Sequence, residues 1–112
     1  MRKRELREIH DRDIQGMAVY SNDGELVGSV SCQISDPEAY THRYLIVQHN
    51  SDRFAIPSDA ISDISQTGIT LSLRADVLEF LPPYDERLGY AFELRVHLAL
   101  NRTPYWEIDS NV

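Results

Sequence analysis

Residues 17–34 alternate apolar and polar positions on either side of a short turn. Before the turn, Met17 and Val19 share one face of the chain. After it, the alternating positions are Leu26, Gly28, Val30, Cys32 and Ile34. Successive side chains of a strand point to opposite faces, so this period of two predicts two strands, with Val27 as an extra apolar residue facing outward. Residues 21–24 between them contain asparagine and glycine, which tolerate the positive φ of a tight hairpin.

Short apolar segments recur further along the chain and extend this β pattern. They are residues 43–49, 54–57 and 69–73, with residues 58–65 as an extended or helical link. Pro57 has no amide hydrogen, so it ends the pairing of its strand or lies at a sheet edge. Several short strands at close spacing are typical of a compact antiparallel barrel or sandwich.

The two ends of the chain carry different patterns. In residues 5–14, Leu6, Ile9 and His10 lie within one helical turn of each other, which predicts a short N-terminal helix. In residues 90–100, every second residue is apolar, which favours a strand. A helix is the alternative there, because a helical wheel groups Glu93 with His97 but places Arg95 among apolar residues.

The glycines at positions 16, 24 and 28 do not form a phosphate-binding loop. Such a loop leads from a strand into a helix, and here another strand follows Gly24 and no Gly-Lys-Ser/Thr sequence is present. We expect Gly24 to serve the turn and Gly28 to allow a bend or a close backbone approach.

The length of 112 residues suits one domain, and the net charge of −7 restricts its partners. Residues 1–13 sum to +1 and the remaining 99 residues to −8. An acidic body repels phosphate backbones, so we expect no direct nucleic-acid binding but a partner with a basic patch. The sequence shows no signal peptide or transmembrane segment, which predicts a cytoplasmic protein with peripheral membrane contact at most. The single cysteine, Cys32, is expected to be a buried thiol.

Catalytic and metal-ligating patterns are weak. The four histidines are scattered, and residues 10–13, His-Asp-Arg-Asp, come nearest to a ligand cluster. No serine occupies a Gly-x-Ser-x-Gly elbow. We therefore expect no catalytic residues, no metal and no cofactor.

Four motifs in order resemble the PRC-barrel family, named after the photosynthetic reaction centre, over roughly residues 13–86. The hairpin motif is matched by Ile14, Gly16, Val19, Tyr20, Asp23, Gly24, Glu25, Gly28 and Val30. The later motifs are matched by Arg43, Tyr44, Leu45 and Val47, then by Ile56 and Pro57, and finally by Leu81, Pro82, Pro83, Tyr84 and Asp85.

The resemblance implies a six-stranded antiparallel barrel that serves as a docking module without barrel chemistry. The family includes the cytoplasmic domain of the reaction centre H subunit, which caps a membrane complex. It also includes the barrel of a ribosome-maturation factor, which contacts a ribosomal protein. We expect residues 1–13 to be a helical lead-in, 14–86 the barrel, and 87–112 an extension.

The extension carries the candidate partner-binding residues. They are Tyr90, Phe92, Tyr105 and Trp106. Tyrosine and tryptophan often anchor interfaces, and an alternating strand outside a complete barrel can pair with another chain. A symmetric homodimer through residues 88–108 is one hypothesis. The alternative is that the extension folds back and covers the barrel, with Trp106 at one end.

The sequence thus predicts a non-enzymatic protein-binding or assembly module, an adaptor built on a PRC-like barrel. One alternative is a peripheral component of a photosynthetic or other membrane complex. Another is an accessory factor in ribosome or RNA maturation that acts through protein contact.

Overall fold

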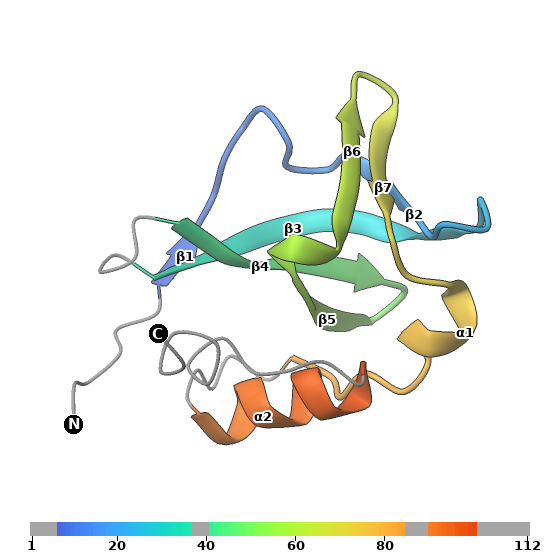
Figure 1. The fold of residues 1–112 in the computed structure, drawn as a ribbon. Coiled ribbons are helices and arrows are strands. Elements are labelled where there is room, and N and C mark those ends of the chain that lie inside the picture. The colour runs from blue at the N-terminus through green and yellow to red at the C-terminus, as the bar shows by residue number, and fades with distance from the viewer. Residues whose placement is uncertain (1–6, 37–40, 85–89, 101–112) are drawn as a thin grey trace, which may run out of the picture.

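The computed structural model describes residues 7–36, 41–84 and 90–100, and within them the chain is mainly β (Figure 1). Seven strands form one sheet. They are β1 (Arg7–Ile9), β2 (Ala18–Tyr20), β3 (Leu26–Asp36), β4 (Thr41–His49), β5 (Asp52–Pro57), β6 (Ile61–Ser65) and β7 (Gly68–Leu71). The helical elements are a 3₁₀ turn (Ser58–Ala60), α1 (Ala75–Leu78) and α2 (Tyr90–Ala99).

The sheet is open and mixed, so the expectation of a closed antiparallel barrel of six strands is not confirmed. Its order is β5-β4-β3-β2-β7-β6, with β1 beside β3. The strands β2 and β7 run parallel, with Val19 opposite Ile69, whereas the other pairs are antiparallel. The β6–β7 hairpin lies at the edge of β2 that is not paired with β3. In this position β7 runs in the same direction as β2, so the β2–β7 pair is parallel. Figure 1 shows β6 and β7 rising steeply from the plane of β3 and β4.

The predicted hairpin of β2 and β3 is confirmed, together with the roles of its two glycines. Gly24 has a φ of 84°, the left-handed region that the turn requires. A Cβ on Gly28 would lie 2.2 Å from the carbonyl oxygen of Gln48, so β3 approaches β4 too closely for any side chain there. The orientation expected at the start of β3 is wrong. Leu26 is 62% exposed and Val27 turns inward, because the pairing shifts register beside Tyr20.

The N-terminal segment forms a strand rather than the predicted helix. Strand β3 has 11 residues, and β2 pairs only with its first part, from Leu26 to Ser29. The later part of the same edge presents backbone groups that need hydrogen-bond partners, and β1 supplies them, with Ile9 opposite Gln33. A helical turn is formed only afterwards, where the amide of Gln15 donates to the carbonyl of Asp11 at 2.9 Å.

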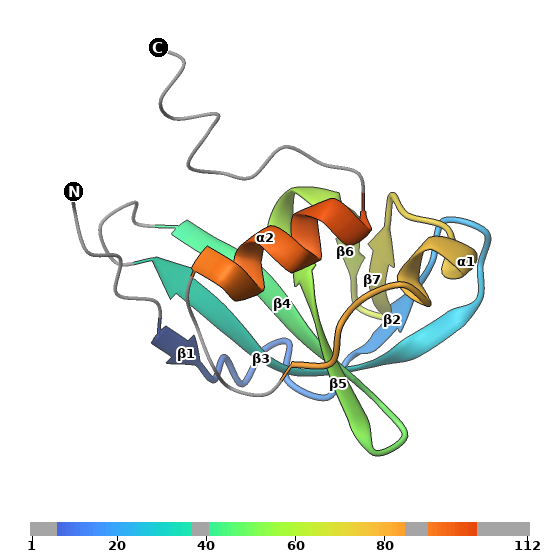
Figure 2. The same ribbon diagram turned by 90° about the horizontal axis from the view of Figure 1, so that it is seen from below.

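Residues 90–99 form α2, so the strand interpretation is wrong and the helical alternative holds. The buried positions of this segment are Phe92, Glu93, Val96, His97 and Leu100, which follow the period of a helix. Figures 1 and 2 show α2 lying across one face of the sheet.

The core lies between the curved sheet and the two helices. Cys32 belongs to it at 2% exposure, which confirms the buried thiol. Its fully buried members are Val19, Ile34, Tyr44, Ile46, Val47, Ala55, Ile56, Ala60, Ile69, Leu71 and Val96. Pro57 ends β5, an edge strand of the sheet, as its missing amide hydrogen predicts. None of the helices in the described ranges combines the length and hydrophobicity needed to cross a bilayer.

Candidate protein-binding groove

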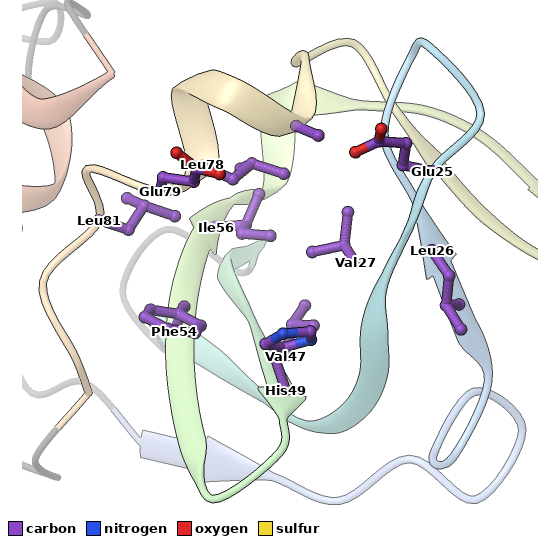
Figure 3. Close-up of a pocket in the computed structure, with 11 residues that line it drawn as sticks. Glu25, Leu26, Val27, Val47, His49, Phe54, Ile56, Leu78, Glu79 and Leu81 are labelled. Carbon is purple, nitrogen blue, oxygen red and sulfur yellow. The ribbon is translucent and has the colours of Figure 1, made fainter.

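A groove with a volume of about 320 Å³ opens between the sheet and α1 (Figure 3). Strands β3, β4 and β5 supply one side of it, and α1 with the segment after it supplies the other. The lining residues are Glu25, Leu26, Val27, Val47, His49, Phe54, Ile56, Ala75, Leu78, Glu79 and Leu81. We call this feature the α1 groove.

The floor of the α1 groove is apolar. Val47 and Ile56 are fully buried on neighbouring strands, and Leu78 and Leu81 face them from the helical side. Val27 points into the space from β3 (Figure 3). Such a surface gains free energy when an apolar group displaces water from it.

The rim of the α1 groove is acidic. Glu25 lies just before β3, and Glu79 follows α1 as its C-cap residue, so the two carboxylates stand on opposite sides of the opening. Among the lining residues that the structure describes, the imidazole of His49 is the other ionisable group, and none is a lysine or an arginine. Two arginines adjoin lining residues in the chain: Arg74 pairs with Asp76 at 3.4 Å, and the guanidinium of Arg53 lies over the Tyr84 ring, 5.3 Å from its centroid. The rim therefore favours cationic groups.

Two large apolar side chains remain exposed on the segments that border the groove. Leu26 lines the groove and is 62% exposed. Phe80 lies between the lining residues Glu79 and Leu81 in the chain and is 74% exposed. Single exposed apolar residues are common, but two on the segments that border an apolar groove make this groove the candidate interaction surface.

The turn at residues 21–24 holds α1 in place across the groove. The amide of Asn22 donates to the carbonyl of Leu73 at 2.8 Å, and Oδ1 of Asp23 accepts a hydrogen bond from the amide of Ala75 at 3.3 Å. Residue Arg74, at the N-cap position of α1, makes no capping bond with its side chain. Asp23 therefore supplies from a distant turn the acceptor that an N-cap residue normally provides.

Hydrogen bonding lowers the pKa of Asp23 below its ordinary value of 3.8. The largest cause is the hydrogen bond from the Ser21 hydroxyl, and the amide of Ala75 adds to it. Both donors stabilise the ionised carboxylate. The sequence identified this turn as a hairpin but gave no sign that it also caps α1, because the partner lies 52 residues away.

A second polar cluster lies buried beneath α2. The hydroxyl of Tyr44 donates to Oε1 of Glu93 at 2.8 Å and lies 3.0 Å from Nε2 of His97. Since the single hydroxyl proton points to Glu93, His97 donates to the tyrosine oxygen through a protonated Nε2. All three residues are at most 1% exposed, so this cluster attaches α2 to β4 and presents no open site.

Tyr84, from the last of the predicted motifs, connects three elements. Its hydroxyl donates to Oε1 of Glu8 at 2.8 Å, and its amide donates to the carbonyl of Arg53 at 2.7 Å. Its ring lies 5.7 Å from the ring of Phe92. The segment after α1 is thereby fixed between β1, β5 and α2.

The residues predicted to bind a partner are not brought together in the described part of the chain. Phe92 is 3% exposed and packs on Tyr84, so it covers the core and does not belong to an exposed aromatic patch. Tyr90 begins α2, but its side chain lies outside the described residues, as do Tyr105 and Trp106. Partner contacts by these four residues stay a prediction. The exposed His10 lies 3.9 Å from a carboxylate oxygen of Glu8 and contributes nothing to the α1 groove.

Comparison with known proteins gives one family match. The family model of the PRC-barrel domain matches residues 6–78, which include all seven strands and α1. The match stops before α2. The search of curated proteins finds no match.

Proposed function

The chain belongs to the PRC-barrel domain family, and on that premise we propose that it is a non-enzymatic protein-binding or assembly module, an adaptor whose docking surface is the α1 groove. The observation that carries the proposal is the exposure of Leu26 and Phe80 beside an apolar floor. An interface commonly places a buried apolar anchor inside a polar rim, and the α1 groove offers both parts.

Co-purification with matched variants tests this proposal. Leu26→Ser removes a side chain that is 62% exposed on β3 beside the groove, and Ile64→Ser removes one that is 55% exposed on β6. Because β6 contributes no lining residue, the second variant controls for a general loss of surface hydrophobicity. We expect a partner that co-purifies with the unaltered chain and the Ile64 variant to be lost with the Leu26 variant. Equal recovery with both variants contradicts the proposal.

Two narrower roles follow from the family resemblance and are tested by fractionation. A peripheral component of a photosynthetic or other membrane complex co-sediments with membranes and is released by salt. An accessory factor in ribosome maturation co-sediments with ribosomal subunits through a protein contact. We expect the loss of the α1 groove to abolish either association.

We further propose that α2 contributes to a homodimer, as residues 88–108 predict. On its outer side, Leu94 and Leu98 are 40% and 66% exposed, while the inner side covers the sheet. Since residues 90–99 are helical, this dimer uses helix packing and no strand exchange. Light scattering of the unaltered chain and of Leu98→Ser tests it: we expect a dimer that the substitution dissociates, and a monomer in both cases contradicts it.

A further inference from the structure

We propose that the α1 groove binds a segment of a partner protein in which one large apolar side chain is flanked by lysine or arginine. The inference rests on the proposed function and adds the chemistry of the partner. It follows from the size of the groove, the charge of its rim and the apolar side chains at its edge.

The volume limits what enters the groove. The groove's volume of about 320 Å³ lies at the small end of the roughly 300–1,000 Å³ that ligand pockets span. The floor of Val47, Phe54, Ile56 and Leu78 offers no charged group. The occupant of the floor is therefore a single large aliphatic or aromatic side chain rather than a whole helix.

The charge of the rim specifies the residues beside that anchor. Glu25 and Glu79 stand on opposite sides of the opening, so a segment that crosses it passes both carboxylates. Lysine or arginine on either side of the anchor pairs with them, whereas acidic neighbours are repelled. The net charge of −7 acts in the same direction at long range and accelerates the approach of a basic partner.

The edge of the groove favours a polypeptide over a small molecule. A small organic cation whose apolar part contacts the floor leaves most of the Leu26 and Phe80 side chains in water. A chain that continues past the opening reaches the segments that carry both side chains, because Leu26 lines the groove and Phe80 lies between two lining residues in the chain. Burial of these exposed side chains adds to the affinity.

The first test is selection of random peptides displayed on phage, with the immobilised full chain as target. Peptides that also bind the Leu26→Ser/Phe80→Ser variant are removed by counter-selection. Both replaced side chains are largely exposed, so the variant is expected to fold, and circular dichroism checks this. We expect the selected peptides to be enriched in a large apolar residue with lysine or arginine nearby.

The second test measures the charge dependence of the selected peptides by fluorescence anisotropy. Glu25→Gln/Glu79→Gln removes both rim carboxylates, and we expect it to weaken binding roughly fivefold in low salt. Asp13→Asn/Asp63→Asn is the matched control, since it changes the net charge equally at exposed positions outside the groove. We expect this control variant to change the affinity for the peptides less than twofold. Added salt should weaken binding to the unaltered chain.

The outcomes separate this inference from the proposed function. Peptides that need the groove but show no basic residues overturn the inference and leave the protein-binding groove standing. Selection that yields no groove-dependent peptide contradicts both the inference and the proposed function. A dimer of the unaltered chain that Leu26→Ser dissociates identifies a second copy as the occupant, which also overturns the inference.

Discussion

The hydroxyl of Tyr44 on β4 donates a hydrogen bond to Oε1 of Glu93 on α2 at 2.8 Å, with both side chains fully buried. This contact makes a carboxylate acceptable on the inner side of a helix that covers an apolar core. The imidazole of His97, one helical turn later, reaches the same hydroxyl at 3.0 Å. The polar cluster therefore fixes where α2 lies on the sheet.

Removal of the Tyr44 hydroxyl should destabilise the protein. In Tyr44→Phe, Glu93 and His97 lose a shared partner inside the core, and loss of a hydrogen bond to a buried polar group costs about 1–3 kcal/mol. Urea unfolding at neutral pH measures the change in the free energy of unfolding. Tyr20→Phe is the matched control, because the half-buried Tyr20 makes no hydrogen bond through its hydroxyl within the described residues. Equal stability of the two variants contradicts the role of the cluster.

Truncation after residue 85 should prevent stable folding. It removes Phe92, Val96 and Leu100, and burial of each large apolar side chain contributes about 1.5–3 kcal/mol. The sum is comparable with the whole stability of about 5–15 kcal/mol of a small domain. Circular dichroism and size-exclusion chromatography check this. A truncated chain that unfolds cooperatively with an unchanged midpoint contradicts the account.

The two glycines of the hairpin should respond differently to alanine. In Gly28→Ala the new Cβ meets the Gln48 carbonyl oxygen at 2.2 Å, so β3 and β4 must separate, at a cost of about 3 kcal/mol or more. In Gly24→Ala no atom lies within 4 Å of the new Cβ, and the cost is the strain of a positive φ, about 1–2 kcal/mol. Urea unfolding of both variants shows which substitution lowers the free energy of unfolding more. A larger loss at Gly24 contradicts the close approach of the strands.

The contribution of Asp23 should depend on pH in a defined direction. Its pKa is lower in the folded chain than the ordinary 3.8, so its ionised form stabilises the folded state above that value. The contribution is lost as the pH falls through the lowered pKa of the folded state. We expect the stability difference between the unaltered chain and Asp23→Ala to be constant near neutral pH and to shrink below about pH 4. A difference that grows on acidification contradicts this assignment.

Local patterns predicted the hairpin of β2 and β3 and the edge position of Pro57, because turn chemistry and a period of two act between neighbouring residues. They could not predict the parallel pairing of Val19 with Ile69, which depends on how the β6–β7 hairpin returns to the sheet. They also missed β1, whose few residues owe their strand conformation to the unpaired edge of β3.

The error at α2 has a chemical cause. The inner side of the helix contains Glu93 and His97, and the outer side contains Leu94 and Leu98, so the usual separation of apolar and polar sides is absent. The alternation of apolar residues then resembles a strand. Glu93 and His97 face inward because the hydroxyl of Tyr44 is their partner there. Tyr44 is distant in the sequence, so a pattern within residues 90–100 cannot include it. The α1 groove was likewise missed, since its two sides meet only in the folded chain.

Site-specific photo-crosslinking in cells of the source organism tests the central claim most directly. A photoreactive residue replaces Leu26 or Phe80 at the groove, and in parallel Ile64 on β6, which contributes no residue to it. We predict that positions 26 and 80 crosslink the same partner protein and that position 64 does not. Crosslinking of that partner from position 64 alone would show that the chain binds through another surface.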